Sequence, residues 1–167
     1  MRRVAFGLGA NLGDRVVALQ GAVDVLAPVL VEPVVSSVYE SSPVGGVEQP
    51  DYANAVLVGG SDAEPAALLA LAHAAEQEWH RTRDVRWGPR TLDVDVLVVG
   101  ELVSDDPVLT LPHPRLRERG FVLLPWAEAD PGAALPDGAR VADLAAAWVA
   151  GADVVQRRTD VALVVAS

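Results

Sequence analysis

Short apolar runs bounded by turn residues alternate along this chain with longer segments in which apolar residues recur at helical spacing. Four of the runs have the length of β-strands: residues 4–8, 29–39, 52–58 and 93–99. Residues 64–79 carry a stripe of leucines and alanines, and residues 15–26 follow Asp14, a residue type that caps helices. Pro33 is expected to break the second strand. The pattern therefore predicts the order β-α-β-β-α-β.

This order is typical of ferredoxin-like folds, so the expected fold class is α+β. Further along the chain, residues 121–128 and 141–149 have helical patterns, whereas residues 101–103, 154–158 and 161–165 are candidates for short strands. The chain has 167 residues, of which 51% are hydrophobic. It is therefore expected to form a single domain over its whole length.

Charge and composition argue against several classes of protein. A net charge of −10 argues against nucleic-acid binding, because nucleic-acid binders usually carry a basic surface. No apolar run approaches the length of a membrane span, and the N-terminus lacks the apolar segment of a secretion signal. Cysteine is absent, which excludes disulfides and thiolate metal sites. We expect a soluble, unprocessed cytoplasmic protein, a monomer that binds neither nucleic acid nor membranes.

Two carboxylates interrupt the apolar strand expected near residues 92–99. Asp93 and Asp95 are two positions apart, so their side chains point to the same face of a strand, with Cα atoms about 6.5 to 7 Å apart. Two acids so close are costly without a cation, and oxygen ligands suit Mg²⁺, which completes its coordination with water and phosphate oxygens. The alternative, for this D-x-D pattern alone, is an exposed strand face that forms surface salt bridges.

Arginines cluster directly before this strand. All thirteen basic residues are arginine, and seven of them fall in residues 81–90 and 115–119, so an acidic protein can still hold a locally positive cleft. Forked guanidinium groups match phosphate oxygens in bidentate fashion. The first segment holds Arg81, Arg83, Arg86 and Arg90. Because this segment directly precedes the two acids, the combination favours a nucleotide and metal site and a phosphoryl-type transfer.

A tyrosine and an asparagine share one face of the strand expected at residues 52–58. Tyr52 and Asn54 could form a half-buried strand edge, or they could bind a flat heterocycle, the ring by stacking and the amide as donor and acceptor. Glu76 lies near the end of its expected helix, where the helix dipole disfavours an acid, and this indicates a functional role. The glycine-rich turn at residues 7–14 lacks the spacing and the lysine of a phosphate-binding loop, so we assign it no catalytic role.

Four motifs follow one another along the chain: residues 7–14, 41–54, 86–95 (Arg-Trp-Gly-Pro-Arg-Thr-Leu-Asp-Val-Asp) and 109–121. Together they resemble the 6-hydroxymethyl-7,8-dihydropterin pyrophosphokinase family. The resemblance covers residues 3–150, and we assign no role to the C-terminal stretch beyond it. It implies a ferredoxin-like core elaborated into a three-layer α/β/α sandwich, with the substrates bound between loops.

The resemblance also implies a reaction, in which pyrophosphate passes from ATP to the hydroxymethyl group of the pterin and AMP leaves, as a step of folate biosynthesis. Two Mg²⁺ ions would be held by Asp93 and Asp95, and the implied catalytic residues are Arg81, Arg90, Asp93 and Asp95. The implied ATP-binding residues are Glu76, Arg83, Arg86, Val96, Thr110, His113 and Arg119. The implied pterin-binding residues are Ser42, Pro43, Val44, Tyr52, Asn54, Trp87 and Phe121.

Two other functions remain open on the residues alone. One is a different Mg-dependent nucleotidyl- or phosphoryltransferase on a ferredoxin-like core, and the other is a nucleotide-sensing module without catalysis. The presence of both acids argues against the sensor, because binding alone rarely needs two metal ions on one phosphate chain. His113, which lies between two prolines, could likewise be only a turn residue.

Overall fold

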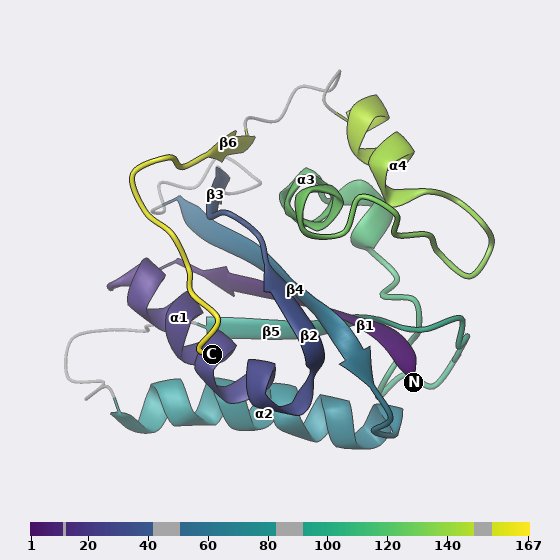
Figure 1. The fold of residues 1–167 in the computed structure, drawn as a ribbon, viewed down its shortest axis with the longest axis horizontal. Helices are drawn as coiled ribbons and strands as arrows, with labels where there is room; N and C mark the ends of the chain where they lie inside the picture. The colour runs from purple at the N-terminus through teal and green to yellow at the C-terminus, as the bar shows by residue number, and fades with distance from the viewer. Residues whose placement is uncertain (12, 42–50, 83–91, 149–154) are drawn as a thin grey trace.

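The computed structural model shows helices and strands arranged around one sheet (Figure 1). The residues it describes are 1–11, 13–41, 51–82, 92–148 and 155–167, with the side chains of residues 81 and 82 excepted. The strands are β1 (Arg2–Ala10), β2 (Val31–Val35), β3 (Tyr39–Ser41), β4 (Tyr52–Ser61), β5 (Leu92–Val99) and β6 (Val155–Arg157). The α-helices are α1 (Arg15–Leu26), α2 (Pro65–Thr82), α3 (Gly120–Ala129) and α4 (Val141–Trp148), and the 3-10 turns are η1 (Ala27–Val29) and η2 (Leu116–Glu118).

The first strand lies inside the sheet, next to the edge strand β5, because β1 pairs antiparallel with β4 on one side and with β5 on the other. The strand order is β5-β1-β4-β3-β6, and β2 also pairs with β4. Along the chain, β1-α1-β2-β4-α2-β5 follows the β-α-β-β-α-β order predicted from the sequence, with β3 and β6 added at one side. The expected α+β class is confirmed.

Helices cover both faces of the sheet (Figure 1). On one face, α1 and α2 pack against the strands through a core that includes Phe6 and Leu68. On the other face, α3 and α4 pack over Val56 through Trp126. Because both faces are covered, every residue from 53 to 61 is buried. No helix in the described part of the chain is long and apolar enough to cross a membrane.

The helices α1 and α2 begin where the sequence signals predicted. Asp14 caps α1 as expected, since its Oδ1 accepts a hydrogen bond from the backbone N–H of Val17 at 3.2 Å. Pro65 is the first residue of α2, where the missing N–H costs nothing. The end of α2 differs, because the helix continues three residues past Trp79 to Thr82. The backbone of Arg81 therefore belongs to the last turn of this helix.

The strand predicted at residues 29–39 is interrupted, but not at Pro33 as expected. Residues 27–29 form η1, and the strand that contains Pro33 continues to Val35 before the chain leaves the sheet. The pairing of β2 with β4 shifts register between Val31 and Val34, and Glu32 has a φ of 50°. Such an irregularity accommodates Pro33, which has no N–H to donate. The expectation that Pro33 breaks the strand is wrong.

The C-terminal stretch, to which the sequence assigned no role, completes the sheet. The strand expected at residues 154–158 is confirmed, because β6 lies within this range and pairs with β3. The strand expected at 161–165 is wrong, because this stretch is not part of the sheet and Leu163 is instead buried in the core, with Val161 and Val165 packed beside it. Residues 101–103 likewise form no strand.

Close packing between α3 and α4 requires glycine at the start of α3. A Cβ atom on Gly120 would lie 2.3 Å from Cδ2 of Trp148, far inside van der Waals contact. We expect Gly120→Ala to lower the free energy of unfolding by about 1–3 kcal/mol, because the two helices must move apart. Urea unfolding followed by circular dichroism measures this change. Gly132→Ala is the control, since a Cβ there meets nothing within 4 Å, and equal effects of the two substitutions would contradict the packing argument.

Candidate active site

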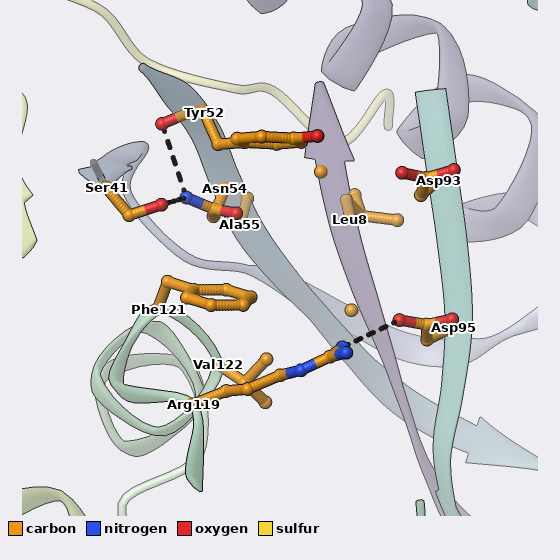
Figure 2. A pocket seen from close by; sticks show the side chains of 12 residues that line it. Leu8, Ser41, Tyr52, Asn54, Ala55, Asp93, Asp95, Arg119, Phe121 and Val122 are labelled. Atoms are coloured by element: carbon orange, nitrogen blue, oxygen red, sulfur yellow. Dashed lines mark hydrogen bonds and ion pairs between the residues drawn. The ribbon is translucent and has the colours of Figure 1, made fainter. Parts of the chain in front are cut away.

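A cavity of about 240 Å³ lies between one end of the sheet and the start of α3 (Figure 2). Its floor comes from β1, β4 and β5, and its opposite wall comes from the residues at the start of α3. The lining residues are Gly7, Leu8, Gly9, Ser41, Tyr52, Asn54, Ala55, Asp93, Asp95, Arg119, Phe121 and Val122. The cavity thus brings together six of the residues predicted from the sequence, taken from segments that are far apart in the chain.

The pairing register of the sheet explains how these residues meet. In β1, Gly9 pairs with Asn54 of β4 on one side and with Asp93 of β5 on the other. Residues directly opposite one another in neighbouring strands point to the same face, so the amide and the acid lie in one row across the sheet. Gly7 pairs with Asp95 in the same way, two residues along. The two glycines have no side chains, and this leaves the floor between the polar groups open.

The two acids lie on one face of β5, as the sequence predicted, and both side chains reach the cavity (Figure 2). The pKa of Asp93 is raised, first by partial loss of contact with water and then by the negative charge of Asp95. Arg119 faces the second acid, with its Nη1 3.6 Å from Oδ2 of Asp95. The Nε2 atom of His113 lies 3.9 Å from the same oxygen. Cationic or potentially cationic groups therefore lie near Asp95.

Two further predicted residues lie beside the acids. Glu76 of α2 reaches β5, where its Oε1 accepts a hydrogen bond from the backbone N–H of Val94 at 3.3 Å. Its pKa is raised, chiefly by burial and also by the charges of Asp93 and Asp95. The pKa of His113 is lowered, chiefly by burial, although the charge of Asp95 opposes this shift. The histidine is therefore more than a turn residue, because its ring faces an acid of the cavity.

The amide of Asn54 is fixed by its neighbours. The residue is 3% exposed, and its Nδ2 donates to Oγ of Ser41 at 2.9 Å and to the carbonyl oxygen of Tyr52 at 3.3 Å (Figure 2). It also donates to the carbonyl oxygen of Tyr39 at 3.2 Å. These three acceptors occupy both N–H groups. The sequence predicted that the amide would offer both a donor and an acceptor. In this arrangement the amide oxygen is the atom turned towards the cavity, and the role of the amide as both donor and acceptor stays a prediction.

Two aromatic rings lie on opposite sides of the cavity. Tyr52 belongs to β4 and Phe121 to α3, and Figure 2 shows both rings edge-on, with Asn54 deeper between them. The guanidinium carbon of Arg119 lies 5.6 Å from the centre of the Phe121 ring, which is within the range of cation–π attraction. A flat heterocycle between the rings would be held on both faces and would meet the amide oxygen at its edge.

Asp93 and Asp95 are the described residues best placed to hold a metal ion. Over the described ranges, no group of three or more histidine, aspartate or glutamate side chains is arranged to bind a metal. Mg²⁺ needs only one or two protein carboxylates when phosphate oxygens and water complete its octahedral shell. The pKa of Asp93 is raised chiefly by burial and then by the charge of Asp95, and a bound cation would relieve this repulsion. The donor set therefore fits Mg²⁺ that arrives with a phosphorylated ligand.

The remaining predicted residues lie elsewhere or outside the described part. The side chain of Val96 is buried in the core with α1 and α2, so only its backbone is available to a ligand. Thr110 donates its hydroxyl to the carbonyl oxygen of Asp106 at 3.0 Å. Eight predicted residues have side chains outside the described part of the structure: Ser42, Pro43, Val44, Arg81, Arg83, Arg86, Trp87 and Arg90.

Sequence reasoning missed several residues of the cavity, among them Ser41, Gly7 and Gly9. A glycine inside a strand often marks a place where a ligand or another backbone approaches closely, and this signal could have drawn attention to the two glycines. Ser41 could have been found only from the pairing of β3 with β4, which places it opposite Tyr52.

Residues 5–131 match a protein family described as 7,8-dihydro-6-hydroxymethylpterin-pyrophosphokinase (HPPK). Among the relatives of this chain, the 2-amino-4-hydroxy-6-hydroxymethyldihydropteridine pyrophosphokinase of Pseudomonas aeruginosa is 40% identical over 149 residues, which cover 88% of this chain and 92% of the relative. The protein of the same name from Bacillus subtilis is 43% identical over 132 residues, which cover 77% of this chain and 78% of the relative.

The fold is similar to solved HPPK-DHPS structures. One, in complex with substrates, aligns with a TM-score of 0.69 at 11% identity and covers 89% of this chain and 43% of that chain. The wild-type Plasmodium falciparum HPPK-DHPS with pteroate aligns with a TM-score of 0.65 at 13% identity, over 89% of this chain and 42% of the other. At such identities the similarity concerns the fold alone, and this chain spans less than half the length of those proteins.

Proposed function

The chain belongs to the 7,8-dihydro-6-hydroxymethylpterin-pyrophosphokinase family, and from this membership we propose that the cavity between the sheet and α3 is its active site. The enzyme transfers pyrophosphate from ATP to 6-hydroxymethyl-7,8-dihydropterin, a step of folate biosynthesis. One observation carries the assignment of the site. Asn54, Gly9 and Asp93 lie in one row across three strands, so a group suited to a heterocycle and a group suited to a metal face one cavity.

The pterin binds, in this proposal, on the side of the cavity formed by β4 and α3. Tyr52 and Phe121 hold the two faces of the bicyclic ring, and Oδ1 of Asn54 accepts a hydrogen bond from its edge. Residues 42–44 and Trp87 complete the pterin site in the same proposal. The row across the sheet then directs the hydroxymethyl group towards Asp93, which is the acid paired through Gly9 with the strand of Asn54.

ATP binds on the other side, with its phosphates towards β5 and the arginines. Asp93 and Asp95 would hold two Mg²⁺ ions, which would supply positive charge against the charge of the phosphate chain. Arg119 and His113, which face Asp95 in the structure, turn to the nucleotide phosphates when the acid is engaged. The other nucleotide-binding residues in this proposal are Glu76, Arg83, Arg86, Val96 and Thr110.

In the reaction, the hydroxymethyl oxygen attacks the β-phosphorus of ATP. The bond between the β-phosphorus and the oxygen that bridges to the α-phosphate breaks, and AMP leaves with that electron pair. The proton of the attacking hydroxyl group is released to the solvent. Asp93 orients the attacking hydroxyl group, and Arg81 and Arg90 hold the transferred phosphates at the transition state. The stacking side chains keep the pterin in register with the acids, so that the two substrates meet in the geometry of attack.

The proposal also covers the layer architecture and the domain organisation of the protein. We assign the chain a ferredoxin-like core elaborated into a three-layer α/β/α sandwich that forms a single domain. The strand order β5-β1-β4-β2 and the helices on both faces of the sheet support it. The proposal keeps a monomer as the expected working unit.

Product analysis tests the function directly. The protein mixed with ATP, Mg²⁺ and 6-hydroxymethyl-7,8-dihydropterin should yield AMP and the pterin diphosphate in equal amounts. Excess EDTA should stop the reaction and added Mg²⁺ should restore it, while a pterin with a methyl group in place of the hydroxymethyl group should give no AMP. Formation of ADP would indicate a different kinase, and absence of any product would favour a nucleotide-sensing module.

A further inference from the structure

The C-terminal segment holds one wall of the cavity from behind. β3 is only three residues long and lies between β4 and β6, so Ser41 pairs with Tyr52 on one side and with Val155 on the other. Figure 1 shows β6 beside β3 and the last residues running from there across α1. So short a strand makes few hydrogen bonds of its own, and its position depends on both neighbours. Residues 155–167 lie beyond the part of the chain that matches the family.

A cluster of charges fixes β3 to this segment. Oε1 of Glu40 lies 3.3 Å from Nη1 of Arg158 and 2.9 Å from Nη2 of Arg15. Arg158 also donates its backbone N–H to the carbonyl oxygen of Val38 at 2.8 Å. The side chains of Arg15, Glu40 and Arg158 are 24%, 28% and 25% exposed, so salt and water screen their attraction less than that of a surface pair.

The same cluster reaches the start of β4. Nη1 of Arg15 donates to the carbonyl oxygen of Asp51 at 2.6 Å, and Asp51 directly precedes Tyr52. Arg15 therefore joins the strand that carries Ser41 to the strand that carries Tyr52. Because Arg158 shares Glu40 with Arg15, the C-terminal segment is a third member of this connection.

The far end of the segment is anchored on α1. Gln20 forms two hydrogen bonds with the backbone of Val164, one from its Nε2 to the carbonyl oxygen at 2.7 Å and one to its Oε1 from the N–H at 2.9 Å. Leu163 is buried in the core beside them. The segment is thus held at both ends, by β3 and by the helix that carries Arg15, and Arg158 cannot move away freely from Glu40.

The hydrogen bond between Ser41 and Asn54 transmits this position to the cavity. Oγ of Ser41 accepts from Nδ2 of Asn54 at 2.9 Å, which turns the amide oxygen towards the cavity. We propose that the C-terminal segment positions the pterin-binding wall, with Arg158 and Glu40 as the positioning residues that hold β3, Ser41 and the amide of Asn54 in place. This inference rests on the proposed pterin role of Tyr52 and Asn54. Asp93 and Asp95, on the other side of β1, are not part of the connection.

The test is a comparison of two Michaelis constants in the full-length protein. Arg158→Ala removes the pair with Glu40 and also the pair with Asp160. It should raise the KM for the pterin about five- to tenfold, while kcat and the KM for ATP stay within about twofold. Arg158→Lys restores a positive charge opposite Glu40 and should recover most of the loss. Arg3→Ala is the matched control, because it removes an arginine–carboxylate pair of 3.0 Å to Asp130 near the start of β1.

A second measurement separates positioning from general stability. In a nitrogen–proton correlation spectrum, the side-chain amide signals of Asn54 should shift in Arg158→Ala and stay unchanged in Arg3→Ala, even if both variants lose similar thermal stability. An unchanged KM for the pterin, equal increases for both substrates, or unshifted Asn54 signals would overturn the inference. If Arg158→Ala does not fold, Glu40→Gln replaces it, because the amide keeps the size and an oxygen acceptor.

The failure of this inference can be told apart from failure of the proposed function. If the wild-type protein forms no AMP from ATP and the pterin, the function is wrong. If the wild-type protein is active and Arg158→Ala keeps the wild-type KM for the pterin, the enzyme stands and the positioning role is wrong.

Discussion

Asp95→Asn is expected to reduce turnover by about 10³-fold or more, because metal coordination supplies several kcal/mol of transition-state stabilisation and each 1.36 kcal/mol changes a rate by about tenfold. The neutral amide has the size of the acid, but it cannot offer two charged oxygens to Mg²⁺. Asp93 alone then faces both the metal and the phosphates. Steady-state AMP formation at saturating ATP, pterin and Mg²⁺ measures the loss.

The fold should tolerate this substitution, since the Asp95 side chain is 43% exposed and its contacts to Arg119 and His113 are long. Asp62→Asn is the matched control, because that side chain is 85% exposed and pairs with the N-terminal amino group near the end of β4. It should keep wild-type turnover. Turnover of a folded Asp95→Asn protein within a few-fold of wild type would remove this residue from the proposed metal site.

Phe121→Ala is expected to weaken pterin binding by about 30- to 100-fold, since a buried and stacked ring contributes about 2–3 kcal/mol. ATP should bind nearly as before, because the proposal places the ring on the pterin side, and among the described residues its contact with Arg119 is the link to the proposed nucleotide site. Isothermal titration with each ligand measures the two affinities separately.

Phe121→Leu is the control for the shape of the pocket. Leucine fills much of the same volume but has no flat face, so its affinity for the pterin should fall between those of the wild type and the alanine variant. Equal losses for ATP and pterin in Phe121→Ala would place the ring outside the pterin site. If Phe121→Leu bound the pterin as tightly as the wild type, the conclusion would also be that the ring does not stack on the pterin.

Local spacing was sufficient to predict the parts of the site that depend on one strand. Asp93 and Asp95 share a face because strand side chains alternate, and Tyr52 and Asn54 share one for the same reason. The helix start at Asp14 could be predicted for a similar reason, because a cap acts on residues within one turn of it.

Features that depend on pairing between distant segments could not be predicted from spacing. β3 and β6 are separated by more than one hundred residues, and nothing near either segment specifies that Ser41 lies opposite Val155. The occupied N–H groups of Asn54 have the same origin, since their acceptors are fixed by the pairing of β3 with β4. The course of β2 through Pro33 depends on an irregular register with β4.

The glycine floor of the cavity has a consequence for inhibitors and for resistance to them. Gly7 and Gly9 present only main-chain atoms between the acids and Asn54, and a Cβ on Gly9 would lie 3.6 Å from Oδ1 of Asn54, in the space above the floor. Any side chain introduced there to exclude an inhibitor would also take room from the substrate. If the cavity binds the pterin as proposed, a compound that fills it down to this floor would contact a surface where an added side chain should also weaken substrate binding.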